Sequence, residues 1–125
     1  MTVRSLAATT VSPDDWEVPE REAVQVIKHI VVWRFKDEAL GASRAENLEH
    51  AKAAIESLRE SVPQVRHLEV GVDIRADHDP CDLVIYSEFE TVDDLKAYQV
   101  HPEHVRIAQL IGEMRESRAV VDYEV

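Results

Sequence analysis

Residues 26–35 constrain the fold of this chain more than any other part of its sequence. Apolar and β-branched residues dominate the stretch, which predicts a β-strand. Its odd positions are apolar apart from His29, and Ile30 and Val32 make the middle of the other face apolar too. A strand with one face in water alternates between apolar and polar side chains. Both faces of this strand therefore need a cover.

The sequence divides into a tail and one domain. A chain of 125 residues can form one hydrophobic core but not two. Residues 1–25 carry two prolines and scattered charges with no sustained apolar period, so we expect an N-terminal extension there and a single domain over residues 26–125. Trp16 is the exception in the extension, and we expect it to anchor the tail to the domain or to its partner.

Two helical regions are indicated by their terminal signals. Ser43 begins a capping box with the glutamate three residues later, which predicts a helix that ends at Pro63. Thr91 predicts the start of the second region, and His101 before Pro102 predicts a break and a restart in it. Helical spacing gives the expected core faces, which are Leu48, Ala51, Ile55, Leu58 and Val62 in the first region, and Val105, Ala108, Ile111 and Met114 after the break.

Three further strands complete the domain. Alternating apolar residues predict strands at residues 65–74 and 81–90, and the turn chemistry of residues 77–80 joins the two as a hairpin. Residues 118–125 are expected to close the chain as the last strand. The expected core positions in the hairpin are Leu68, Val70, Val72 and Ile74 in its first strand, and Leu83, Ile85 and Phe89 in its second.

The resulting order of elements is β-α-β-β-α-β, which is typical of an α+β domain with a ferredoxin-like, antiparallel four-stranded sheet. In that plan the helices cover one face of the sheet and leave the other bare. Because the strand of residues 26–35 has two apolar faces, a second copy of the chain is the simplest cover for the bare face. We therefore predict a homodimer that forms a dimeric α/β barrel; the alternative is a monomer with an exposed apolar sheet.

The charge of the chain excludes two classes of partner. A formal net charge of −11 at pH 7 repels phosphate backbones and anionic lipid headgroups, so we expect no nucleic acid and no membrane partner. The apolar run of residues 30–33 is far shorter than the roughly 20 residues that span a bilayer. Residues 1–12 lack the apolar stretch of a secretory signal, and Cys81 is the single cysteine, which together favour a cytoplasmic protein.

Metal sites and nucleophiles have little support in the sequence. No His-x-x-x-His or Cys-x-x-Cys spacing occurs, and three glycines cannot form a phosphate-binding loop. His78 lies in a turn with Asp77, Asp79 and Asp82, where we expect a solvated cluster rather than a weak cation site. Cys81 begins a strand without a base placed beside it by the sequence. We predict neither a metal nor a cofactor.

One set of residues has the chemistry of an acid-base site. Tyr98, His101 and His104 surround the break between the helices, and His29 reaches toward them from the first strand. A histidine exchanges protons near neutral pH and a tyrosine hydroxyl can hold a carbonyl oxygen, so the pattern favours proton abstraction beside a carbonyl group. In the alternative interpretation His101 caps a helix, His104 bonds to a strand carboxylate such as Asp122, and His29 is a hydrogen-bonded core residue.

Several short segments resemble one known family when they are taken together and in order. They are Ile27-Lys28-His29-Ile30-Val31, Phe35-Lys36-Asp37, Leu68-Glu69-Val70-Gly71, Ser87-Glu88-Phe89-Glu90, Tyr98-Gln99-Val100-His101-Pro102-Glu103-His104-Val105 and Val120-Val121-Asp122-Tyr123. Over these segments, from about residue 27 to residue 125, the chain resembles the stress-responsive A/B barrel (Dabb) family. The resemblance implies the dimeric ferredoxin-like barrel. It implies no single activity, because members include stress-associated proteins and a plant polyketide cyclase that catalyses an intramolecular aldol condensation without a cofactor.

The resemblance to the cyclase implies roles for two residues. In its His-Pro-x-His motif the second histidine is the base, and the tyrosine three residues before the motif assists, so these catalytic roles fall on His104 and Tyr98. Two further polar pocket positions of the cyclase are Ile55 and Leu83 in this chain, which predicts a less polar pocket.

We therefore predict one small, mostly apolar pocket per subunit between sheet and helices. It would bind a small carbonyl or aromatic compound and support cofactor-independent, cyclase-like acid-base chemistry. The alternative is a non-catalytic stress or assembly protein whose dimerisation is its function, and an oxygenase relative ranks third because no motif matches. The expected site residues are His104 and Tyr98 as catalytic groups, and His29, Trp33, Phe89 and Asp122 as ligand-binding groups.

Overall fold

The computed structural model of the protein describes residues 25–75 and 80–125, so the expected anchor at Trp16 and most of the expected turn of residues 77–80 lie outside the described residues. The elements, in chain order, are β1 (Ile27–Phe35), β2 (Glu38–Ala39), β3 (Ala42–Ser43), α1 (Arg44–Glu56), α2 (Leu58–Ser61), β4 (His67–Val72), β5 (Leu83–Phe89), α3 (Val92–Val100), α4 (Pro102–Met114) and β6 (Arg115–Glu124).

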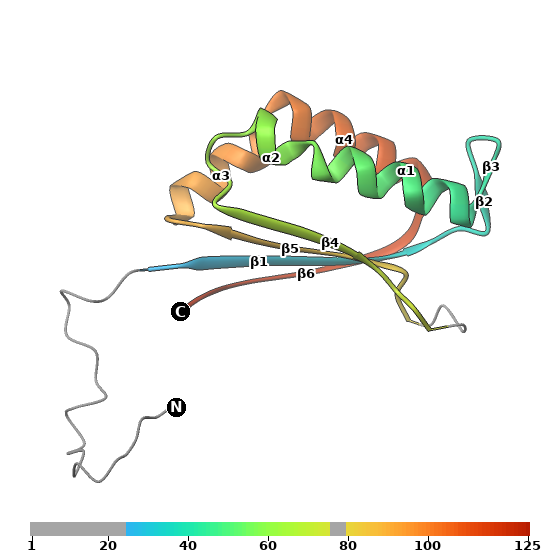
Figure 1. The fold of residues 1–125 in the computed structure, drawn as a ribbon, viewed down its shortest axis with the longest axis horizontal. Helices are drawn as coiled ribbons and strands as arrows, with labels where there is room; N and C mark the ends of the chain where they lie inside the picture. Colours follow the sequence, from blue (N-terminus) through green and yellow to red (C-terminus); the bar gives the residue numbers. More distant parts are fainter. Residues whose placement is uncertain (1–24, 76–79) are drawn as a thin grey trace, which may run out of the picture.

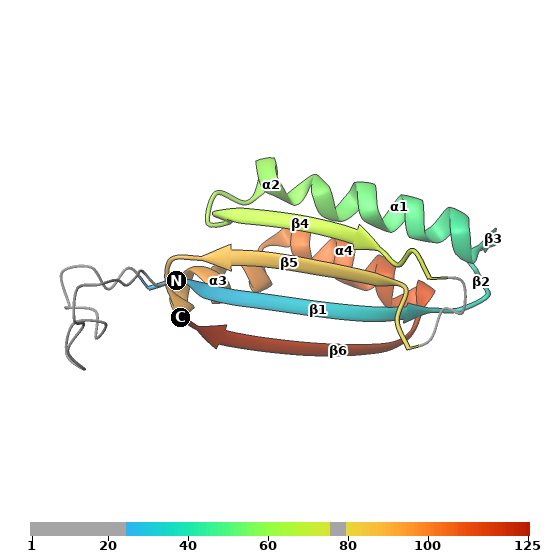
Figure 2. The same cartoon turned by 60° about the horizontal axis from the view of Figure 1, so that its bottom comes forward.

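Four of the strands form one antiparallel sheet in the order β4-β5-β1-β6 (Figure 2). Together with the helices between the strands, this arrangement is a ferredoxin-like α+β fold, as predicted. β1 lies in the interior of the sheet and pairs with β5 on one side and with β6 on the other. β4 and β6 are the two edge strands, and β6 therefore has one free edge within the described chain.

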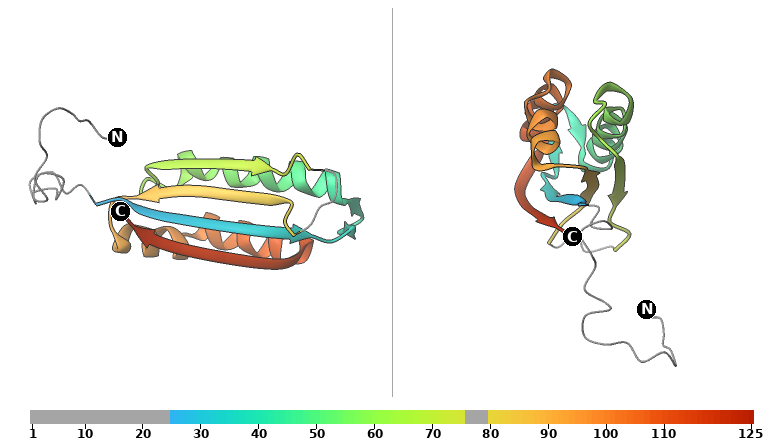
Figure 3. Two further views of the ribbon diagram at one scale, coloured as in Figure 1. Left: turned by 90° about the horizontal axis from the view of Figure 1, so that it is seen from below. Right: turned by 90° about the vertical axis from the view of Figure 1, so that its left-hand side faces the viewer.

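Within the described ranges, the larger helices all lie on one face of the sheet and leave the opposite face bare (Figures 1 and 3). The five side chains of β1 that point toward the helices are buried, and the four that point the other way are only partly covered. The helices thus cover one of the two apolar faces predicted for this strand. No described residue covers the second face.

Three caps set the helix starts where the sequence predicts them. The Ser43 hydroxyl accepts a hydrogen bond from the Glu46 amide, and the Glu46 carboxylate accepts one from the Ser43 amide, which completes the capping box. Thr91 caps α3 through its side chain. At the break, Nδ1 of His101 accepts a hydrogen bond of 3.1 Å from the Glu103 amide, so this histidine has the capping role of the alternative interpretation.

Two local features differ from the sequence prediction. The first helical region is interrupted at Ser57, whose hydroxyl donates to the Ala54 carbonyl, so α1 ends at Glu56 and α2 follows as a separate turn. A small β2-β3 hairpin before α1 was not predicted, and it turns at Leu40 and Gly41 with φ of 56° and 74°. Because only glycine adopts such angles without strain, Gly41 suits this turn.

Some expected core residues are exposed. Ile74 is 98% exposed because β4 ends at Val72, short of the predicted boundary. On α4, Val105 and Ala108 are exposed, whereas Ile107 joins the predicted Ile111 and Met114 in the core. The reason is that α4 contacts α1 and α3 as well as covering the sheet, and these neighbours select which helical face turns inward.

Among the polar residues, Asp82 differs most clearly from its sequence prediction. It is 1% exposed rather than solvated, and its Oδ2 accepts a hydrogen bond of 2.8 Å from the Phe35 amide. Its other turn neighbours, residues 77–79, lie outside the described ranges. Within those ranges no group of three His, Cys, Asp or Glu side chains is arranged to hold a metal ion, and no helix is long and apolar enough to cross a membrane.

Candidate functional site

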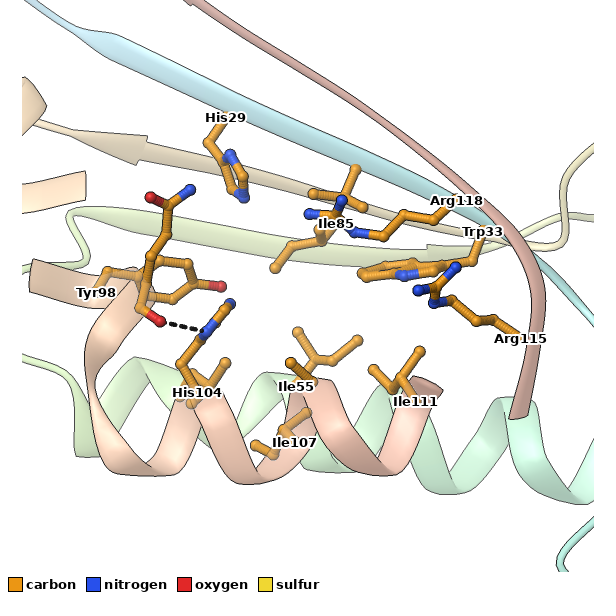
Figure 4. A pocket seen from close by; sticks show the side chains of 14 residues that line it. His29, Trp33, Ile55, Ile85, Tyr98, His104, Ile107, Ile111, Arg115 and Arg118 are labelled. Atoms are coloured by element: carbon orange, nitrogen blue, oxygen red, sulfur yellow. Dashed lines mark hydrogen bonds between the residues drawn. The ribbon is translucent and has the colours of Figure 1, made fainter. Parts of the chain in front are cut away.

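A cavity of about 270 Å³ lies between the sheet and the helices. Three polar side chains from three different elements meet at one end of it: His29 of β1, Tyr98 of α3 and His104 of α4 (Figure 4). Its volume is just below the range of roughly 300–1,000 Å³ that is usual for ligand pockets, so a small ligand would fit. Apolar side chains form most of the remaining wall, namely Val31, Trp33, Ile55, Leu58, Ile85, Ile107, Ala108 and Ile111.

His29 is held by a carboxylate on the neighbouring strand. The pairing of β1 with β6 sets His29 opposite Asp122, and Nδ1 of the ring is hydrogen bonded to Oδ1 of the aspartate. Because a carboxylate accepts, Nδ1 carries the proton of this bond, and the rest of the ring borders the cavity. Asp122 thus sets both the orientation and the tautomer of this histidine.

His104 has the same tautomer for a different reason. It lies in the first turn of α4, and its Nδ1 donates a hydrogen bond of 3.0 Å to the backbone carbonyl of Gln99. Burial lowers the pKa of His104, while the bond to Gln99 opposes that shift. The ring is therefore uncharged at neutral pH. Its Nε2 carries no proton and can accept one.

Tyr98 places a hydroxyl group between the two histidines. Its side chain is 2% exposed, and its ring centroid lies 4.5 Å from that of His104 and 6.0 Å from that of His29. Burial raises the pKa of Tyr98 far above its usual value, so the hydroxyl stays protonated and can donate a hydrogen bond. In Figure 4 this hydroxyl points toward His104 and into the cavity.

Four of the six residues expected in the site border the cavity, namely His29, Trp33, Tyr98 and His104. Phe89 lies behind Tyr98, with the two ring centroids 4.9 Å apart, and is outside the lining. Asp122 is also outside the lining and acts on the cavity through His29. The alternative bond between His104 and Asp122 is wrong, since these residues bond to Gln99 and His29 respectively.

Three polar lining residues were not predicted: Gln99, Arg115 and Arg118. Ile55, which matches a polar position of the cyclase, lines the cavity, whereas Leu83 does not. Alternation along β6 was the pattern that pointed to Arg118 as a lining residue, because the antiparallel pairing of β6 with β1 places Arg118 opposite Trp33. The sequence prediction missed it because it named the strand but assigned no partner to each of its residues.

The chain is similar to known proteins of one family. The profile of the stress responsive A/B barrel domain family matches residues 27–125. A stress-response A/B barrel domain-containing protein of Arabidopsis thaliana is 25% identical over 101 residues, which is 78% of this chain. The chain spans only 46% of that relative.

Solved structures agree with this match. A dimeric protein of unknown function with a ferredoxin-like fold from Bacteroides fragilis is 36% identical, with a TM-score of 0.72 over 80% of this chain and 96% of that one. A hydroxynitrile lyase from Passiflora edulis is 20% identical, with a TM-score of 0.67 over 82% of this chain and 94% of that one. At this lower identity the likeness shows the fold alone.

Proposed function

The chain belongs to the stress responsive A/B barrel domain family, and from that premise we propose that it binds a small carbonyl compound and transfers a proton beside the carbonyl group without a cofactor. One observation carries the proposal. Two histidine rings and a protonated tyrosine hydroxyl, from three different elements, converge on one small and largely apolar cavity.

Each polar residue has a defined role in this proposal. Nε2 of His104 takes a proton from the carbon next to the carbonyl group, and the electron pair moves onto the carbonyl oxygen as an enolate. The Tyr98 hydroxyl donates a hydrogen bond to that oxygen, which stabilises its developing charge. The protonated His104 then exchanges its proton with solvent and returns one to the enolate carbon, while His29, oriented by Asp122, borders the same end of the cavity. The apolar wall around Trp33 provides a surface for the apolar part of the compound.

The Passiflora edulis structure supports carbonyl chemistry on this scaffold. A hydroxynitrile is the adduct of a carbonyl compound and cyanide, and its cleavage requires removal of the hydroxyl proton. That step needs the same kind of base and hydrogen-bond donor that the cavity contains. The identity of the two proteins is too low to transfer the substrate, so the proposal names only the carbonyl group.

The test is deuterium exchange at a carbon next to a carbonyl group. In D₂O, the protein is expected to accelerate loss of the methyl proton signal of 4-acetylbenzoate or acetophenone, compared with the same concentration of imidazole, as followed by ¹H NMR. Because burial lowers the pKa of His104, the acceleration should persist below the usual histidine pKa of about 6.5. The proposal fails if no ketone in a broad panel exchanges faster with protein than with imidazole.

We further propose that the protein works as a homodimer through the bare face of its sheet, and that it is cytoplasmic. The face has an apolar centre, and the Bacteroides fragilis protein with the same fold is described as dimeric. Packing of two such sheets would remove this surface from water. Side chains at paired positions make up the centre, namely Ile30, Val32, Val84, Tyr86, Val121 and Tyr123.

Substitution of Val121 by aspartate is expected to weaken the dimer. Val121 is 52% exposed in the single chain, so the substitution leaves the protomer core intact. Burial of the new carboxylate in the interface should cost about 1–3 kcal/mol, or roughly 5- to 150-fold in the dimer dissociation constant. Sedimentation equilibrium measures this constant directly.

The matched control is Val100→Asp, which introduces the same charge at an exposed valine of α3 on the helical side. Equal dissociation constants for the two variants would contradict the proposed interface.

A second candidate function is a non-catalytic stress or assembly protein, which the unpartnered sheet face favours. That candidate would be favoured if Val121→Asp weakens the dimer and the protein exchanges no proton beside a carbonyl group.

A further inference from the structure

The cavity has a second polar end, which the proposed proton transfer does not use. Arg115 and Arg118 of β6 line it beside Trp33, away from the tyrosine and histidine end (Figure 4). No aspartate or glutamate from the described part of the chain belongs to the lining. Arg115 is partly buried and Arg118 is exposed, so two positive charges border a mostly apolar cavity.

The strand register directs these arginines toward the helices. Paired positions in an antiparallel sheet share a face, and β1 places Trp33 opposite Arg118 and Phe35 opposite Arg115. Trp33 and Phe35 belong to the buried, helix-facing side of β1. A register shift between Arg34 and Phe35 accompanies this pairing, and β6 begins directly after α4, so both arginines reach the same end of the cavity.

The cavity arginines also differ from other arginines of the chain in their partners. Arg34, Arg44 and Arg106 form ion pairs with Glu116, Asp37 and Glu103, at distances between 2.7 and 2.9 Å. No carboxylate within the described ranges forms such a pair with Arg115 or Arg118. In a chain with a formal net charge of −11, the two arginines thus form a local positive site without a carboxylate partner among the described residues.

The chemistry of the guanidinium group indicates the kind of ligand. Its planar set of donors matches the two oxygens of a carboxylate, and such charge-assisted bonds are stronger than neutral ones. The positive charge of Arg118 contributes to the lowered pKa of His104, so the two ends of the cavity are close enough to influence each other. One small molecule could therefore contact both ends.

We propose that Arg115 and Arg118 bind a carboxylate group, so that the ligand class of the cavity is a small carbonyl compound that also carries a carboxylate. The carbonyl group lies at Tyr98 and His104, and the carboxylate lies at the arginines. The carbonyl end of this assignment rests on the proposed function. The carboxylate end rests on the two arginines alone.

Isothermal titration calorimetry with three matched probes tests the assignment. The probes are 4-acetylbenzoate, its methyl ester, and benzoate, which has the carboxylate but no ketone. The acid is expected to bind about 10- to 100-fold more tightly than the ester, as expected for hydrogen bonds to a charged group. The preference should shrink as salt is added.

Variants then assign the preference to the two arginines. Combined Arg115→Gln and Arg118→Gln substitutions are expected to bring acid and ester to equal affinity, and the paired lysine substitutions should keep part of the preference. The control is Arg106→Gln, which removes the same charge from the outer side of α4, where Arg106 pairs with Glu103, and it should leave the preference unchanged. If the glutamine variant does not fold, the lysine variant and the salt dependence decide the question.

The possible outcomes separate the two proposals. Equal affinity of wild-type protein for the acid and the ester overturns the carboxylate site and leaves the proton-transfer proposal standing. Binding of benzoate that depends on the arginines, without exchange of any ketone, supports the carboxylate site and overturns the proton-transfer proposal. Absence of binding by all three probes overturns the assigned ligand class at both ends.

Discussion

The variant His104→Gln is expected to slow proton transfer by about 100- to 10,000-fold, which is the usual contribution of a positioned acid or base. Glutamine can keep a hydrogen bond to the Gln99 carbonyl through its amide group, so the start of α4 should stay in place. It cannot take a proton at any accessible pH. The initial rate of deuterium exchange into the methyl group of 4-acetylbenzoate, at saturating probe, measures the loss.

The control for this variant is His67→Gln. His67 lies at the start of β4, with its side chain half exposed beside Glu69, and the substitution should leave the exchange rate unchanged. Urea unfolding of both variants checks that any lost rate is not lost folding. If His104→Gln keeps the rate and His29→Gln loses it, the base is the histidine held by Asp122, and our assignment of the two rings is wrong.

The variant Phe89→Ala is expected to lower the free energy of unfolding by about 3–5 kcal/mol. Phe89 is fully buried at 0% exposure, and its ring packs against Tyr98 at 4.9 Å and against His29 at 6.4 Å between centroids. Its removal leaves a hole directly behind two residues of the site. Urea unfolding at fixed protein concentration measures the change, because association would otherwise shift the apparent stability.

A milder substitution shows whether Phe89 only supports the site or also contacts the ligand. Phe89→Leu keeps most of the volume and should cost less than the alanine variant while leaving the affinity for 4-acetylbenzoate unchanged. A leucine variant that stays stable but binds the probe much more weakly would place Phe89 in contact with the ligand. A loss below about 1 kcal/mol for the alanine variant would contradict the packing described here.

Local signals explain the parts of the fold that were predicted correctly. The capping box at Ser43, the Thr91 cap and the Pro102 restart depend on residues within three or four positions of each other, so the sequence displays them directly. The two apolar faces of β1 likewise follow from apolar residues at both odd and even positions along one strand. These signals were sufficient for the element order and hence for the ferredoxin-like sheet.

The errors arose where several elements share one contact. The inward face of α4 depends on α1, α3 and the sheet together, so spacing along the helix alone selected Val105 and Ala108 instead of Ile107. The local sequence places Asp82 in a turn. In the structure, however, it accepts a hydrogen bond from the buried backbone amide of Phe35 at the end of β1. Neither the elements that surround α4 nor the Phe35 amide can be identified from residues nearby in the sequence.

The sequence by itself determined the four strands of the main sheet and the two helical regions, where these regions start, and which residue types could carry acid-base chemistry. Only the tertiary structure decided that Asp122 holds His29, that His104 bonds to Gln99, and that two arginines of β6 enter the same cavity. The physical reason is the range of the interactions. Caps and alternation act between neighbours along the chain, whereas strand register brings together residues that are more than 80 positions apart in sequence, as with Trp33 and Arg118.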